Sequence, residues 1–207
     1  MRSTPPLDIR RLATTIAVVG LVNAVTIVLM YTVAGFFGPV NDLGVGTAGI
    51  MLAVLAWRLA PAARRSSLNL ATAGVVAATA GATVVALGSL LVLTGRTGWF
   101  LAGHVTMLGY AVLGPWVIGI NVVARRDAWW PQPQTTLGLV AGVTMLCGWF
   151  AIPAILSGLD TPGRVPWYVT VAYIGGVGWF LLLPVWCFRL GQLTPWVAAA
   201  TPAAAKP

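Results

Sequence analysis

The chain has 207 residues, of which 58% are hydrophobic and only 8% are charged. A soluble domain carries roughly 25% charged residues, so this composition excludes a soluble globular protein and a disordered one. The formal net charge of +8 then indicates segments that face an anionic membrane leaflet rather than a nucleic-acid partner. We therefore expect an integral membrane protein that binds lipid and no nucleic acid.

Charged residues divide the sequence into apolar stretches, and five of these exceed the length of about 20 residues that a spanning helix needs. Helices are expected because each span has to satisfy its own backbone hydrogen bonds in lipid. A shorter sixth stretch, from Leu43 to Trp57, is counted as a span on the charge argument below. We predict an all-α bundle of six transmembrane helices in a single domain, residues 1–207. Its helices are expected near 12–36, 42–60, 68–94, 98–123, 136–157 and 166–189, with short frayed tails at 1–9 and 194–207.

With six spans, the cations fall almost entirely at one end of the bundle. Loops on the cytoplasmic side carry an excess of lysine and arginine, so both chain ends are predicted to be cytoplasmic, in an N-in/C-in arrangement. Asp42 is expected to cap the start of the short second span. The cytoplasmic cations would be Arg2, Arg10, Arg11, Arg58, Arg64, Arg65, Arg125, Arg126, Arg189 and Lys206, and the outer ones Arg96 and Arg164.

The third span has the most regular pattern, with glycine at every seventh position: Gly74, Gly81, Gly88 and Gly95. Small residues on one face let neighbouring backbones approach closely, which is how helices associate in lipid. We therefore expect the third span to lie at the centre of the bundle.

Most of the ten tryptophans fall near predicted span ends, where indole rings anchor a helix at the membrane interface. Trp116, Trp149 and Trp179 lie deeper. A buried indole N–H needs a partner, so these three rings are expected to pack or hydrogen-bond inside the bundle, or to line an apolar cavity.

No Asp, Glu, Lys or Arg lies in the middle of a predicted span, which argues against an ion-coupled pump or a voltage sensor. The sole histidine, His104, cannot hold a haem or a metal ion by itself. It is expected to bond to a neighbouring helix or to interfacial water, or to bind a ligand with Asp42 or Asp160 nearby. No nucleophile–base motif is present, so we predict no catalytic residue, no metal site and no cofactor.

Buried polar side chains complete the set of candidate ligand-binding residues. Asn23 is the deepest amide, in the middle of the first span, and it can hold helices together or contact a ligand. The full set of candidate ligand-binding residues is His104, Trp116, Trp149, Trp179, Asn23 and Tyr173.

Two segments, GWFLAGHVTMLGYAVLGPWVIGIN (98–121) and GGVGWFLLLPVWCFRLG (175–191), resemble small multi-pass membrane proteins of bacteria classed as domains of unknown function. The resemblance transfers no activity and no residue role. Together with a composition rich in alanine, glycine and arginine, it implies a bacterial inner membrane.

Three functions remain open. The first is a non-enzymatic accessory, assembly or lipid-interacting component, with other membrane proteins or a second copy as partners. The second is a small carrier or channel for a neutral or apolar solute, gated at kinks from Pro115, Pro153 and Pro184. The third is a membrane enzyme or sensor that uses His104.

Overall fold

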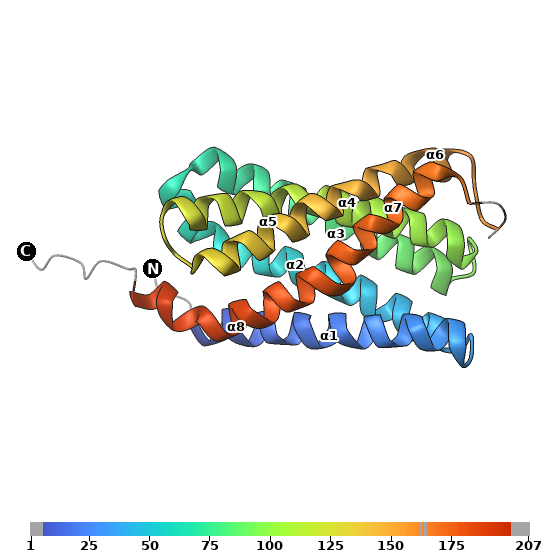
Figure 1. Ribbon diagram of the computed structural model, residues 1–207, viewed down its shortest axis with the longest axis horizontal. Coiled ribbons are helices and arrows are strands. Elements are labelled where there is room, and N and C mark those ends of the chain that lie inside the picture. The colour runs from blue at the N-terminus through green and yellow to red at the C-terminus, as the bar shows by residue number, and fades with distance from the viewer. Residues whose placement is uncertain (1–5, 162, 164, 200–207) are drawn as a thin grey trace, which may run out of the picture.

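A computed structural model describes residues 6–161, 163 and 165–199, and every regular element in them is helical (Figure 1). Four rods are continuous, namely α1 (Pro6–Thr32), α2 (Phe37–Ser66), α3 (Leu68–Leu93) and α4 (Trp99–Arg126). The fifth rod consists of α5 (Gln132–Leu146), a 3-10 segment η1 (Cys147–Ala151) and α6 (Ile152–Leu156). The sixth consists of α7 (Trp167–Val177), a π-helical segment η2 (Gly178–Leu182) and α8 (Leu183–Ala199).

All six rods are long and apolar enough to cross a membrane. Their spans are Ile9–Thr32, Phe37–Ser66, Leu68–Leu93, Trp99–Arg126, Gln132–Leu156 and Trp167–Leu193. Within the described residues, the predicted all-α class and the number of spans are therefore confirmed, and the chain has the architecture of a multi-pass membrane protein. Part of the expected tails is helical, because α1 begins at Pro6 and α8 continues to Ala199; the remainder, 1–5 and 200–207, lies outside the described residues.

The first two helices are joined more tightly than the sequence indicated. The chain leaves α1 with the amide of Ala34 bonded to the carbonyl of Leu29, and α2 already begins at Phe37. Pro39 is accommodated in the first turn of α2, where its missing N–H has no helical partner to lose. Asp42 therefore lies in the second turn of α2, and the prediction that it caps the helix is wrong.

The centre of the bundle is α4 rather than α3. In the most apolar stretch of each span, 61% of α4 is buried but only 39% of α3. Helix α4 packs against α2, α3, α5 and α7, whereas the main neighbours of α3 are α2 and α4. The glycine face of α3 packs against α4. Gly81 and Gly88 meet the backbone of α4, and Gly74 lies against Trp116 of the same helix.

The fourth glycine of the heptad has another role, because α3 ends before it. The amide of Gly95 bonds to the carbonyl of Val92, and the amide of Arg96 bonds to that of Leu91. This pair of bonds is the Schellman arrangement, which needs a left-handed residue, and Gly95 has a φ of 67°. A side chain at Gly95 would have no neighbour within 4 Å, so this glycine terminates the helix and does not pack.

The sixth rod changes direction at its π-helical segment. Pro184 follows η2 and offers no N–H to the carbonyl of Phe180, and a π-helical segment before a proline is a common way for a helix to absorb the missing bond. Pro184 itself packs against Gly20, so α8 lies along α1. On the other side of η2, α7 does not continue along α1 but lies away from it, toward α6 (Figure 1). This divergence creates the space described below.

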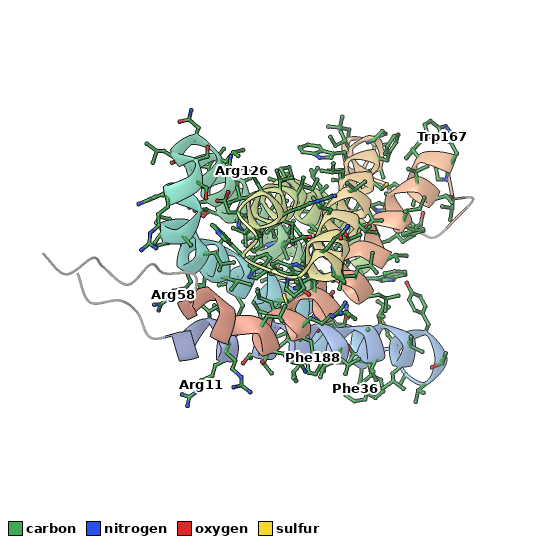
Figure 2. The ribbon with its side chains drawn as sticks, turned by 60° about the vertical axis from the view of Figure 1, so that its left-hand side comes forward. Arg11, Phe36, Arg58, Arg126, Trp167 and Phe188 are labelled. Carbon is green, nitrogen blue, oxygen red and sulfur yellow. The ribbon has the colours of Figure 1, made fainter. Side chains whose placement is uncertain are left out.

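The two ends of the bundle differ in charge. Figure 2 shows Arg11, Arg58 and Arg126 at one end and Phe36 and Trp167 at the other. We call these the arginine-rich end and the Asp160 end, after the carboxylate in the 157–166 loop. Arg2, Arg164 and Lys206 lie outside the described residues.

Candidate functional site

A cavity of about 450 Å³ lies between α1, α2, α4 and the sixth rod, in the half of the bundle nearer the Asp160 end. It occupies the space where α7 diverges from α1. Small-molecule sites in proteins have volumes of roughly 300–1,000 Å³ and mostly apolar walls. The size of this cavity therefore suits a small molecule or part of a lipid.

The cavity opens sideways, between two membrane-spanning helices. On the α1 edge, Tyr31 is 63% exposed and Val28 is also exposed; on the α7 edge, Tyr173 is 41% exposed and Val177 is exposed. All four residues lie inside predicted membrane spans. The opening therefore lies between two helices that are long and apolar enough to cross a membrane.

A chain of aromatic rings forms the wall at the Asp160 end. Tyr31 meets Trp99 edge to face with 5.7 Å between ring centroids, and Trp99 meets Phe100 at 5.5 Å. Phe100 in turn meets His104 at 4.7 Å, again edge to face. These rings link α1 to α4 and give the wall a fixed shape, since aromatic pairs of this geometry attract one another.

His104 borders the cavity and is only 1% exposed. Neither of its ring nitrogens has a hydrogen-bond partner among the described residues. The polar groups close enough to act on the ring are the carbonyl of Phe100, one turn earlier on α4, and the carboxylate of Asp160. The expected bond to a neighbouring helix is therefore not present in the described part of the chain. A buried polar group without a partner is costly, so the imidazole is available to a ligand.

The carboxylate of Asp160 is occupied elsewhere. It accepts hydrogen bonds from the amide of Gly98 at 2.6 Å and from the amide of Leu101 at 3.0 Å. These are amides at the start of α4, so Asp160 fixes the 157–166 loop to that helix end. Of the two carboxylates expected near His104, Asp160 acts as a cap, and Asp42 lines the cavity.

Asp42 is half-buried in the cavity wall beside Asn41. Within the described residues it forms no ion pair; the ion pair found there joins Arg126 to Asp127 at the arginine-rich end. Asn41 accepts a weak hydrogen bond from the hydroxyl of Thr26 at 3.4 Å, which ties α2 to α1. The carboxylate of Asp42 therefore borders the cavity with no cation of the described residues paired to it.

Trp179 forms the floor of the cavity, and Tyr110, which does not line the cavity, is stacked against it. Trp179, in η2, lies parallel to Tyr110 with 4.5 Å between centroids, and the Tyr110 hydroxyl donates to the carbonyl of Val45 at 3.2 Å. The indole nitrogen of Trp179 has no hydrogen-bond partner among the described residues. The stacking on Tyr110 therefore fixes the position of the Trp179 ring in the cavity floor.

The structure brings together three of the six candidate residues: His104, Trp179 and Tyr173 all line the cavity. Asn23 lies below its floor, where its side chain packs against Gly44. The other two candidates lie elsewhere. Trp116 packs against Gly74 and Trp186 toward the arginine-rich end, and Trp149 is 43% exposed on the outer surface.

Tyr31, Asn41, Phe100 and Trp99 were not predicted as cavity residues. Asp42 was predicted both as a helix cap and as a carboxylate near His104; the cap is wrong, and the structure places Asp42 in the wall of the cavity that His104 also borders. A signal for Asp42 was present. Placing the start of the second helix directly after Gly35 would have made Asp42 an ionisable residue inside a span, which is a functional indicator.

Comparison with protein-family models, curated proteins and solved structures finds no match to this chain. The resemblance to bacterial membrane proteins of unknown function therefore stays a prediction. The fold is that of a multi-pass membrane protein, and its cavity opens between two of the candidate membrane spans.

Proposed function

We propose that this protein is a non-enzymatic, lipid-interacting binding protein that takes an amphipathic molecule from the bilayer into the cavity between α1 and α7. One observation carries the proposal. The cavity opens between two candidate membrane spans, where it would meet lipid in a bilayer, and it is bordered by the buried imidazole of His104, which has no hydrogen-bond partner among the described residues.

The arrangement of polar and apolar surface supports this function. An alkyl chain would lie between Val28 and Val177 at the mouth, where both side chains are exposed. A polar head would reach His104 and Asn41, which supply hydrogen-bonding groups on α4 and α2. An amphipathic molecule buries its apolar part equally well in the bilayer and in the cavity. The polar contacts therefore decide whether it stays in the cavity.

We further propose that the arginine-rich end is cytoplasmic and that the membrane is a bacterial inner membrane. The clustering of Arg11, Arg58 and Arg126 at one end supports this orientation through the positive-inside rule (Figure 2). The cavity then opens to the outer leaflet. A periplasm-dependent reporter fused after Arg65 is expected to be inactive, and an active reporter at that site would overturn the orientation.

Two glycines of α4 provide a matched test of binding. Gly103 lines the cavity and Gly119 lies on α4 toward the other end, next to a separate groove. A Cβ at either position meets no atom within 4 Å, so both accept a larger side chain without a backbone clash. Gly103→Leu fills the cavity, while Gly119→Leu makes the same chemical change outside it.

The protein in phosphatidylcholine nanodiscs is photolabelled with a diazirine-tagged dodecanol, and the labelled peptides are identified by mass spectrometry. We expect labelling of peptides that contain Tyr31 and Tyr173 in the wild type and in Gly119→Leu, and a loss of about tenfold in Gly103→Leu. Equal labelling of the two variants at these peptides would overturn the proposed function.

A carrier for such a molecule is the second candidate, and η2 favours it. This π-helical segment contains Trp179 at the cavity floor, and π-helical segments often lie at functional sites. If the protein is a carrier, vesicles that contain it move a fluorescent fatty alcohol between leaflets faster than empty vesicles do. Binding without faster movement would leave the first candidate alone.

A further inference from the structure

We infer that the cavity selects lipophilic ammonium cations over neutral and anionic amphiphiles. This inference rests on the proposed function, because it names the head group of the molecule that the cavity binds. Three features of the Asp160 end carry it: an unpaired carboxylate, a set of aromatic faces, and a helix end that is already capped.

The carboxylate of Asp42 gives the cavity a negative charge. Among the described residues that line it, Asp42 alone carries a charged side chain, and no lysine or arginine is present. Asp42 forms no ion pair within the described residues. In a low-dielectric site a carboxyl group either takes up a proton or stays ionised beside a counter-charge, and an incoming cation supplies that counter-charge.

The aromatic residues around Asp42 fit the same ligand. Tyr31, Trp99 and Asp42 all line the cavity, and all three also border a second space of about 490 Å³ near the 33–36 loop. The two rings and the carboxylate therefore lie where the two spaces meet. Ring faces attract cations, and cages of Trp and Tyr beside a carboxylate suit quaternary ammonium groups.

The N-terminus of α4 borders the cavity but is not free to bind an anionic head group. Phosphates and carboxylates bind at helix N-termini, and Trp99 and Phe100 of the first turn of α4 line the cavity. The carboxylate of Asp160 already occupies two amides there, those of Gly98 and Leu101. A phosphate would have to displace this cap and would also face Asp42.

The test is competition against the diazirine-tagged dodecanol in phosphatidylcholine nanodiscs. The competitors are dodecyltrimethylammonium, dodecanol and dodecyl sulfate, compared at equal mole fractions in the bilayer. We expect dodecyltrimethylammonium to suppress labelling at an about tenfold lower mole fraction than dodecanol, with dodecyl sulfate the weakest.

Asp42→Asn keeps the side-chain shape and removes the charge, and it is expected to abolish the preference for the cation. Asp127→Asn removes a carboxylate at the opposite end and is expected to retain it, which controls for the surface potential of the protein. Should Asp42→Asn fail to fold, Trp99→Leu is compared with Trp167→Leu, whose ring is exposed outside the cavity. The first is expected to weaken the preference and the second to leave it unchanged.

The outcomes separate the two proposals. If dodecanol competes as well as dodecyltrimethylammonium, the cation preference is wrong and the proposed function stands. If the preference persists in Asp42→Asn, the assignment to Asp42 is overturned. If the tagged dodecanol labels no cavity peptide in the wild type, the proposed function fails first.

Discussion

The backbones of Gly81 and Gly109 are in direct contact, so α3 and α4 meet there with no side chain between them. A Cβ on Gly81 would lie 2.6 Å from the carbonyl oxygen of Gly109. A Cβ on Gly109 would lie 2.6 Å from the backbone nitrogen of Val85. Backbone cannot yield as the end of a flexible side chain can, so this contact fixes the spacing of the two helices.

Gly109→Ala is expected to destabilise the protein by roughly 1–3 kcal/mol, because one added methyl group overpacks the contact. The gain in helix propensity of about 1 kcal/mol offsets only part of this loss. Gly119→Ala on the same helix has open space around its Cβ and is expected to be neutral or stabilising. Reversible unfolding in detergent compares the two, and equal stability of both variants would contradict the close contact.

A buried polar network near the arginine-rich end yields a second prediction. The indole N–H of Trp186 donates to the side-chain oxygen of Asn121 at 3.1 Å, and the Gln134 amide donates to the Trp186 carbonyl at 3.0 Å. Trp186→Phe leaves the Asn121 oxygen unpaired in the core and is expected to cost about 1–3 kcal/mol beyond the lost ring area. Trp149→Phe, on the exposed surface, is expected to have little effect.

The double variant Trp186→Phe with Asn121→Leu separates the hydrogen bond from packing. If the bond matters, the two changes are less than additive in the free energy of unfolding, since the second removes the group that the first left unpaired. Strict additivity would show that the two side chains contribute independently.

The pH dependence of stability has a defined contribution from Asp127. Hydrogen bonds from Arg126 and Ser66 hold the pKa of this carboxyl below its ordinary value of 3.8. A lowered pKa in the folded state means that the stabilisation is fully present above pH 3.8 and is lost as the pH falls through the folded-state value. The group is exposed, so the effect is small.

The melting temperature of the wild type is therefore expected to exceed that of Asp127→Asn by a constant amount at neutral and weakly acidic pH. The difference is expected to shrink toward zero in strong acid. A difference that grows on acidification would contradict the assigned contacts. The bond from the Arg126 guanidinium to the Ser66 carbonyl, at 3.1 Å, joins the same two helix ends and remains in the variant.

The sequence determines the spans well because lipid tolerates few charges, and residues such as Arg58 and Arg126 mark the span ends. The sequence does not show which face of a span packs inside the bundle and which face is exposed to lipid. In water a helix has a polar and an apolar face, but in lipid both faces are apolar. Trp149 and Trp179 were therefore equivalent as candidates, although Trp149 faces outward and Trp179 is 7% exposed at the cavity floor.

The cavity itself was beyond the sequence for a related reason. It depends on the divergence of α7 from α1, which follows from the π turn before Pro184 and from the contact of Pro184 with Gly20. Pro184 predicts a kink in the sixth span, but the direction of that kink depends on which helix α8 packs against. Asp42 was misassigned because the helix start was placed at that residue, and one extra turn changes a cap into a cavity-lining residue.

His104 allows a direct test of occupancy, because it is the only histidine in the chain and provides a single imidazole signal. Solid-state NMR of protein labelled with ¹⁵N-histidine, in bilayers with ¹³C-labelled dodecanol, measures dipolar coupling between the ring nitrogens and the alcohol. We expect coupling to the head-group carbon in the wild type and in Gly119→Leu, and none in Gly103→Leu. An imidazole that couples only to protein carbons in the wild type would contradict a ligand-binding cavity at this place.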